Sequence, residues 1–247
     1  MDWFEEWFDS PLYEQLYAHR DEKEANTLAD QIASKFEPDV FPNVLDLACG
    51  RGRHSINLAR RGYKVLGVDL APAAIKKATA TAGDLGLENV RFQTGDMREP
   101  VAETFDMVVN LFTSFGYFDD PADDVQVLKS VKSMLRPGGA FVIDFMNATY
   151  TRNNYVPVDQ KSFGNIDYVG KKYIRDNTIV KELTFVSTET GEKKQFSERV
   201  RLYERPFFES VLPDLGFQIE AVFGEYNGAA FVAATSSRLI IFARLAE

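Results

Sequence analysis

The sequence contains one cysteine and no long apolar run. Cys49 has no second cysteine with which to form a disulfide, so we expect a reducing, cytoplasmic location. No apolar stretch approaches the ~20 residues that a bilayer span requires, and we expect no membrane partner. The first residues include Asp2, Glu5 and Glu6 instead of a basic stretch before an apolar block. We therefore expect no secretory signal.

Dense runs of lysine and arginine are also missing. The 28 Lys and Arg residues are outnumbered by 37 Asp and Glu residues, which gives a net charge of -9 at pH 7. Such a surface repels nucleic acid over most of its area, so we do not expect DNA or RNA as a partner. With only two histidines, His19 and His54, we predict no metal site. We expect a monomer or a homodimer.

The composition is otherwise typical of a globular α/β protein. Hydrophobic residues make up 45% and charged residues 26%, close to the average for globular proteins. A length of 247 residues fits one α/β domain, or one such domain with a modest insertion. Short apolar runs alternate with helical patterns over the first 150 residues. Because helix-length crossovers separate these runs, they predict a parallel, doubly wound sheet. The predicted strands cover residues 43–48, 63–68, 90–93, 105–110 and 140–145.

The two ends of the chain have other patterns. Aromatic pairs four residues apart, such as Trp3 with Trp7, predict a helix near the N-terminus, and a second helix is predicted to end at Phe36. Apolar residues at alternate positions around Thr190-Gly191 predict an antiparallel ribbon. A short helix and two strands, 217–223 and 231–243, follow; with no helix between them, the strands should pair as a hairpin. We predict four parts: an N-terminal helical lid, a core, a β insertion and the C-terminal part of the core sheet, at residues 1–36, 37–150, 151–205 and 206–247.

A glycine loop follows the first predicted strand. Gly50 and Gly52 allow the backbone to turn tightly and approach a ligand, while the next helix offers N–H groups at its start. The third glycine of a dinucleotide fingerprint would fall at Ser55 and is absent. Asp46 would add little to an anion-binding loop and more to a loop that binds an ammonium group. The loop therefore favours a ligand that carries such a group.

Polar residues also follow the next three strands. Asp69 ends the second strand about 20 residues after the loop, where an acid can accept both hydroxyls of an adenosine ribose. Asp96 follows the third strand, where a carboxylate can accept the adenine amino group. The segment 110–115 follows the fourth strand and places polar backbone beside aromatic rings. Ligands lie across the carboxyl ends of strands in open α/β sheets, so these segments should meet.

These motifs resemble those of class I S-adenosylmethionine (SAM)-dependent methyltransferases. The segment 44–52 resembles their motif I, and Pro137-Gly138-Gly139 matches the turn before their fifth strand. The N-terminal helices and the ribbon are similar to those of glycine and sugar-amine N-methyltransferases. The resemblance implies an α/β, Rossmann-like, doubly wound seven-stranded sheet with a C-terminal antiparallel hairpin and a small antiparallel β insertion. It also implies methyl transfer from SAM to a small-molecule acceptor, with an amine as one candidate.

The resemblance assigns roles to individual residues. The glycine loop would contact the methionine part of SAM, Asp69 the ribose, Asp96 with Met97 the adenine, and Arg20 the carboxylate. The full predicted cofactor-binding set is Tyr17, Arg20, Asp46, Ala48, Gly50, Gly52, Arg53, Asp69, Leu70, Asp96, Met97, Asn110, Leu111, Phe112 and Phe115. A neutral amine needs no strong base, whereas a hydroxyl acceptor does. The candidates for such a base are Tyr226, Glu225 and His19.

Simpler interpretations stay open. Arg20 fits a surface charge on a helix, Asp96 an ordinary loop acid, and Glu225 with Tyr226 plain turn residues. An NAD-dependent oxidoreductase is a rival, although the absent third glycine and the antiparallel tail count against it. A SAM-binding regulatory or structural protein without transferase activity is a second rival.

Overall fold

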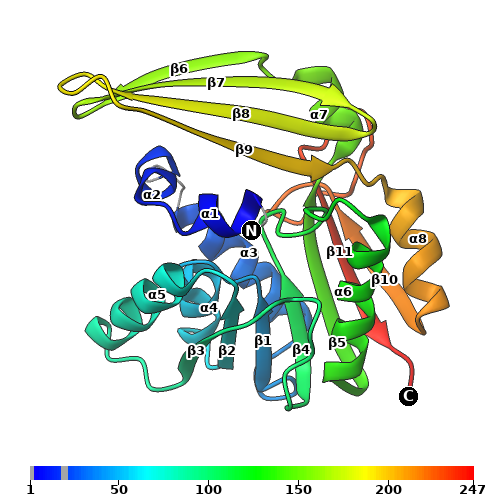
Figure 1. Ribbon diagram of the computed structural model, residues 1–247. Coiled ribbons are helices and arrows are strands. Elements are labelled where there is room, and N and C mark those ends of the chain that lie inside the picture. Colours follow the sequence, from blue (N-terminus) through cyan, green and yellow to red (C-terminus); the bar gives the residue numbers. More distant parts are fainter. Residues whose placement is uncertain (1–2, 18–21) are drawn as a thin grey trace.

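A computed structural model describes residues 3–17 and 22–247. Its main feature is a seven-stranded sheet with the strand order β10-β11-β5-β4-β1-β2-β3 (Figure 1). All of its strands are parallel except β11, which runs antiparallel to both β5 and β10. This arrangement confirms the predicted fold class. The bounds are β1 Asn43–Leu47, β2 Lys64–Asp69, β3 Val90–Thr94, β4 Phe105–Asn110, β5 Leu135–Met146, β10 Phe217–Phe223 and β11 Arg238–Leu245.

Helices cover both faces of this sheet. Successive strand residues point to opposite faces, so Val44 belongs to the core cluster under α3, α4 and α5, and Leu45 to the cluster under α6 and α8. None of the helices in the described ranges is long and apolar enough to cross a membrane. The bounds are α3 Glu22–Lys35, α4 Arg53–Ala59, α5 Pro72–Asp84, α6 Pro121–Met134, α7 Ala148–Asn154 and α8 Arg205–Asp214.

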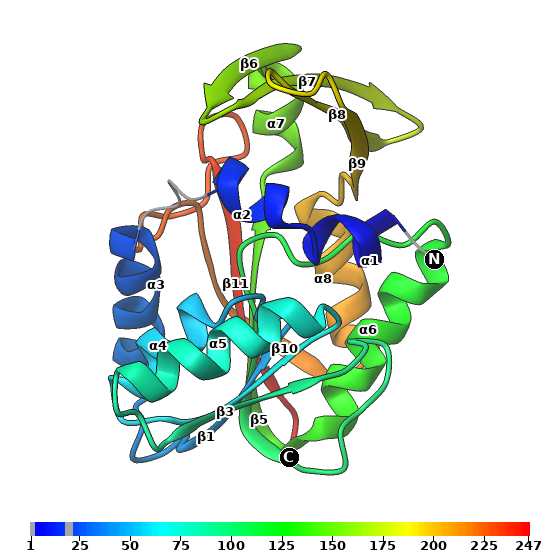
Figure 2. The ribbon, with the colours of Figure 1, turned by 60° about the vertical axis from the view of Figure 1, so that its left-hand side comes forward.

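A second, four-stranded antiparallel sheet lies above the carboxyl ends of the core strands (Figure 1). Two short helices, α1 (Trp3–Phe8) and α2 (Pro11–Tyr17), lie between the two sheets, as both views show (Figure 2). The Trp7 side chain is completely buried, and its ring packs against the rings of Phe185 and Phe196 from the second sheet. The strands are β6 Val158–Phe163, β7 Ile166–Arg175, β8 Thr178–Ser187 and β9 Lys193–Arg201.

The structure differs from the sequence prediction mainly outside the core. The insertion has four strands instead of one hairpin, because β6 and β7 carry many polar residues and lack a clear alternation. The last strand begins at Arg238 instead of Phe231, since the Ser236 hydroxyl accepts the Val232 N–H and folds the intervening residues into a loop. Residues 22–36, which we grouped with the lid, pack on the core sheet.

Candidate active site

A cavity of about 600 Å³ lies between the core sheet and the second sheet. This volume falls within the range of roughly 300–1,000 Å³ that is typical of small-molecule sites. Its floor consists of the segments that follow β1, β2, β3 and β4, as the strand-end argument predicted. Its roof, as we call the lining residues of α1, α2 and β9, consists of Trp3, Phe4, Glu5, Phe8, Tyr13, Glu14, Tyr17, Glu198 and Val200.

The two glycines of the loop have different surroundings. Gly50 has a φ of 55°, and a Cβ placed on it would have no atom within 4 Å. Its backbone therefore faces open space on the cavity floor. Gly52 has a φ of 78°, and a Cβ there would lie 2.7 Å from the Phe92 ring. Gly52 is thus required for packing, and it is not among the residues that line the cavity.

Asp69 joins the end of β2 to the glycine loop. Its Oδ2 accepts the Gly50 N–H at 2.7 Å, and its Oδ1 accepts the Ala71 N–H at 2.9 Å. Burial raises the pKa of Asp69 above its ordinary value, and the backbone N–H groups partly oppose this rise. The carboxylate therefore holds the loop in place while it faces the cavity.

Asp46 lies behind the loop and is 2% exposed. Its Oδ2 accepts the Ser55 hydroxyl at 2.5 Å. Burial raises the pKa of Asp46 to about 7; the Ser55 hydrogen bond opposes this rise, and the charge of Asp69 adds to it. Ser55 thus stands where a dinucleotide fingerprint would have its third glycine, and its hydroxyl group donates a hydrogen bond to Asp46.

Asp96 is engaged by a neighbouring arginine. Its Oδ2 lies 2.6 Å from Arg98 Nη2, and its Oδ1 accepts the Arg98 N–H at 2.8 Å. Burial would raise the pKa of Asp96, but the hydrogen bonds and charge of Arg98 outweigh it and lower the pKa. Asp96 and Met97 both line the cavity, so a ligand would meet an ionised carboxylate there.

The segment after β4 has an unusual backbone. Phe112 and Thr113 have φ values of 61° and 63°, in the left-handed region that bulky and β-branched residues rarely adopt. Asp144 holds both residues: its Oδ2 accepts the Phe112 N–H and its backbone oxygen accepts the Thr113 N–H. Arg238 donates to Thr113 Oγ1 at 2.9 Å and pairs with Asp144 at 2.7 Å. A buried ion pair therefore fixes one wall of the cavity.

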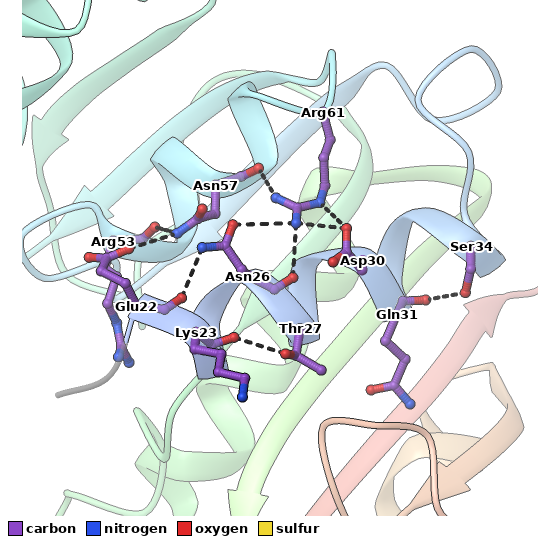
Figure 3. Close-up of polar contacts among 10 residues, drawn as sticks. All are labelled: Glu22, Lys23, Asn26, Thr27, Asp30, Gln31, Ser34, Arg53, Asn57 and Arg61. Atoms are coloured by element: carbon purple, nitrogen blue, oxygen red, sulfur yellow. Dashed lines mark hydrogen bonds and ion pairs between the residues drawn. The ribbon is translucent and has the colours of Figure 1, made fainter.

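Polar side chains connect α3 with α4 and with Arg61, which follows α4 (Figure 3). Arg61 lies 2.7 Å from Asp30 of α3, and Asn57 Nδ2 donates to Glu22 of α3 at 3.3 Å. The same Asn57 group donates to the Arg53 backbone oxygen at 2.9 Å. The Arg53 guanidinium lies 4.6 Å from the Phe112 ring centroid, so it connects the glycine loop with the segment after β4.

The roof is held from both sides. Trp3 Nε1 donates to the Tyr117 backbone oxygen at 3.3 Å, which ties α1 to the core. Trp7 Nε1 donates to Glu198 Oε1 at 2.7 Å, which ties α1 to β9. Sequence reasoning missed Glu198, because no motif surrounds it in a strand with polar residues on both sides.

Ten residues of the predicted cofactor set line this one cavity: Tyr17, Ala48, Gly50, Arg53, Asp69, Leu70, Asp96, Met97, Leu111 and Phe112. Asp46, Gly52, Asn110 and Phe115 lie behind the wall. The Asn110 Nδ2 donates to the backbone oxygens of Leu47 and Ser114 at 3.0 and 3.1 Å, so Asn110 connects β4 with the end of β1. Phe115 is 1% exposed and packs in the core.

The candidate bases lie elsewhere or outside the described residues. Glu225 accepts the Ser237 N–H and hydroxyl at 2.8 Å each, and Tyr226 donates to Asp144 Oδ2 at 3.0 Å. Neither of them is among the described residues that line the cavity. His19 and Arg20 fall in the segment 18–21, outside the described residues.

Known proteins resemble this chain in sequence and in fold. A family model described as a methyltransferase domain matches residues 42–204. A putative methyltransferase of Bacillus subtilis, YqeM, is 26% identical over 212 residues, which cover 81% of this chain and 83% of that protein. Rat glycine N-methyltransferase is 34% identical over 120 residues, 43% of this chain and 41% of the rat protein. The match to the rat protein thus spans less than half of its length.

A solved structure extends the likeness of the fold to nearly the whole chain. The structure of a SAM-dependent methyltransferase from Clostridium acetobutylicum aligns with a TM-score of 0.80 at 19% identity, covering 96% of this chain and 97% of that one. The family model matches more than half of the chain, and this match establishes the family without the structural likeness. The chain belongs to the methyltransferase-domain family, and the methyltransferase class predicted from its sequence is confirmed.

Proposed function

We propose that this enzyme binds SAM on the floor of the 600 Å³ cavity and transfers its methyl group to a small molecule held under the roof. The observation that carries the proposal is the meeting of the Gly50 backbone, Asp69 and Asp96 in one cavity. Bound SAM supplies a sulfonium methyl group that is already activated toward nucleophiles. The protein's own tasks are to bind, align and exclude water.

Different residues of the floor bind different parts of the cofactor. Asp69 accepts the ribose hydroxyls, and its bond to the Gly50 N–H keeps the loop open beside them. Asp96 accepts the adenine amino group, with Met97 beside the ring. Arg20, to which the resemblance assigns the SAM carboxylate, lies outside the described residues. Arg53 lines the cavity and is a second candidate for this role.

The roof supplies water exclusion and the acceptor site. Trp3, Phe8, Tyr13 and Tyr17 present aromatic surface above the floor. A hydroxyl acceptor would need a base to remove its proton, whereas a neutral amine would not. The cytoplasmic location and the monomeric or homodimeric state predicted from the sequence stay predictions.

Calorimetry with SAM, S-adenosylhomocysteine and NAD tests the cofactor. We expect both adenosyl ligands to bind and NAD to give no heat at the same concentrations. Transfer from SAM with a labelled methyl group to a panel of amines, alcohols and carboxylic acids then tests the reaction. Tight NAD binding without SAM binding would refute the proposal. SAM binding with no transfer to any acceptor would favour the regulatory alternative.

A further inference from the structure

Glu198 of β9 places a carboxylate in the roof of the cavity. Its Oε1 accepts the Trp7 indole N–H at 2.7 Å, and the Tyr17 hydroxyl donates to Oε1 and Oε2 at 2.7 and 2.9 Å. A carboxylate has about four lone-pair directions, so these two donors do not exhaust its capacity. They fix the orientation of Glu198 and leave it able to accept from a ligand.

The charged side chains among the described roof residues are all carboxylates. Among the roof's described lining residues, carboxylates are supplied by Glu5, Glu14 and Glu198, and none of these residues is lysine or arginine. Glu14 lies 3.9 Å from Arg51 and 3.8 Å from Lys77, both on the floor. Glu5 is exposed at the rim. Glu198 is therefore the roof carboxylate that lies among aromatic rings.

Lys181 of β8 is a cation close to this group, but it approaches from behind. Its Nζ donates to the Tyr17 oxygen at 3.0 Å, and it is not among the residues that line the cavity. Burial lowers the pKa of Lys181, although the charges of Glu198 and Asp159 partly oppose this. A chain of hydrogen bonds thus runs from Lys181 through Tyr17 to Glu198, and Tyr17 and Glu198 line the cavity whereas Lys181 does not.

A carboxylate among aromatic rings suits one kind of acceptor. Aromatic faces and carboxylates both attract a cation, and both are weak partners for an anion. Methyl transfer to nitrogen moves a positive charge from the sulfonium into the acceptor. A fixed negative charge beside that nitrogen lowers the energy of the transition state. An alcohol gains less, because its oxygen must lose a proton and ends neutral.

We propose that the methyl acceptor is a primary or secondary amine on an apolar body, and that Glu198 binds its nitrogen; this rests on the proposed function. Glu198 accepts an N–H bond from the neutral amine, and the roof aromatics cover the body. The nitrogen lone pair forms the new bond to the methyl carbon as the carbon–sulfur bond breaks and its electron pair stays on sulfur. The ammonium product loses one proton to water.

Matched acceptors test the class of acceptor. Benzylamine, cyclohexylamine and tryptamine are each compared with the alcohol of the same skeleton, in the presence of SAM with a labelled methyl group. We expect transfer to at least one amine and at least about tenfold slower transfer to its alcohol, since a hydrogen bond to a charged group is lost or weakened. Equal rates for amine and alcohol, or no transfer to any of the three amines, would overturn the proposal.

Variants test the residue. Glu198→Gln keeps the shape and an acceptor for Trp7 but removes the charge, and we expect kcat/KM for the best amine to fall about tenfold or more. Binding of that amine to the protein loaded with S-adenosylhomocysteine should weaken in parallel by calorimetry. The matched control is Glu192→Gln, which changes an exposed glutamate before β9 that pairs with Lys194 at 3.5 Å and should have no effect.

Two further measurements separate the possible failures. Trp7→Phe removes one donor to Glu198 but keeps its charge, so the preference for amine over alcohol should persist in this variant and be lost in Glu198→Gln. If both variants lose the preference for amine over alcohol to the same extent, Glu198 has only a structural role in the roof and the proposal fails. SAM affinity should stay within about twofold in Glu198→Gln. Absence of SAM binding by the unaltered protein would instead refute the proposed function itself.

Discussion

The carboxylate of Asp144 accepts the backbone N–H of Phe112 at 2.9 Å. Asp144 lies in β5, and Phe112 follows the neighbouring strand β4. The same carboxylate pairs with Arg238 and accepts the hydroxyl of Tyr226. Asp144 is fully buried, and the Arg238 side chain is 16% exposed. The Asp144 carboxylate therefore neutralises the charge of Arg238 and also holds the Phe112 backbone in the cavity wall.

We expect Asp144→Asn to destabilise the protein by about 3 kcal/mol, because removing one partner of a buried pair leaves the other charge uncompensated. Urea unfolding followed by circular dichroism measures the change. Asp84→Asn, at the exposed end of α5, is the matched control and should change stability by less than about 0.5 kcal/mol. Equal stability of the two variants would show that Arg238 finds another partner.

The two loop glycines should respond differently to alanine. Gly52→Ala would place a Cβ 2.7 Å from Phe92, and the clash and backbone strain should cost about 2–3 kcal/mol of stability. Gly50→Ala meets no neighbour, so only the strain of about 1–2 kcal/mol applies. Its methyl group would project into open space on the cavity floor and should weaken SAM binding at least tenfold. Unfolding curves measure the stability of the two variants, and calorimetry measures their SAM binding. A Gly50→Ala variant that is less stable than Gly52→Ala would contradict the prediction.

Asp46 should make SAM binding depend on pH. Burial raises its pKa to about 7, and a bound ligand with ammonium and sulfonium charges would favour the carboxylate and lower that pKa. Binding then releases a proton, so SAM affinity should rise from pH 6 to pH 8, by at most about tenfold per pH unit. Calorimetry in two buffers of different protonation enthalpy detects the proton. Asp46→Asn should flatten the dependence; an unchanged slope in this variant would assign it to another group.

Asp69→Asn tests the ribose assignment. The amide keeps one acceptor for the N–H groups of Gly50 and Ala71 but loses the charge that two ribose hydroxyls would share. We expect SAM affinity to fall by about 1.5–3 kcal/mol, tenfold or more, with an unchanged circular dichroism spectrum. Asp84→Asn again serves as the control. Unaltered affinity in Asp69→Asn would exclude Asp69 from the cofactor site.

The core of the fold and the cavity floor could be predicted because local patterns determine them. Asp69 and Asp96 each follow a buried strand, and parallel strands bring their carboxyl ends to one edge. Glu198 could not be predicted, because its place depends on how a polar strand of the second sheet packs over α1. The pair of Asp144 and Arg238 was missed for a related reason. The two residues are 94 positions apart, and only the antiparallel pairing of β11 with β5 brings them together.

The roof is encoded by parts of the chain that the core sheet does not use. Residues 158–201 leave the core after α7 and return to it at α8, and both attachment points lie outside the seven strands. With the acceptor bound under the roof as proposed, the acceptor specificity of this enzyme can therefore evolve by substitution or exchange of that segment together with residues 3–17, while the register of the core strands is preserved. Grafting the corresponding segments of a relative onto this core would be a direct route to an enzyme with the same methyl donor and a new acceptor.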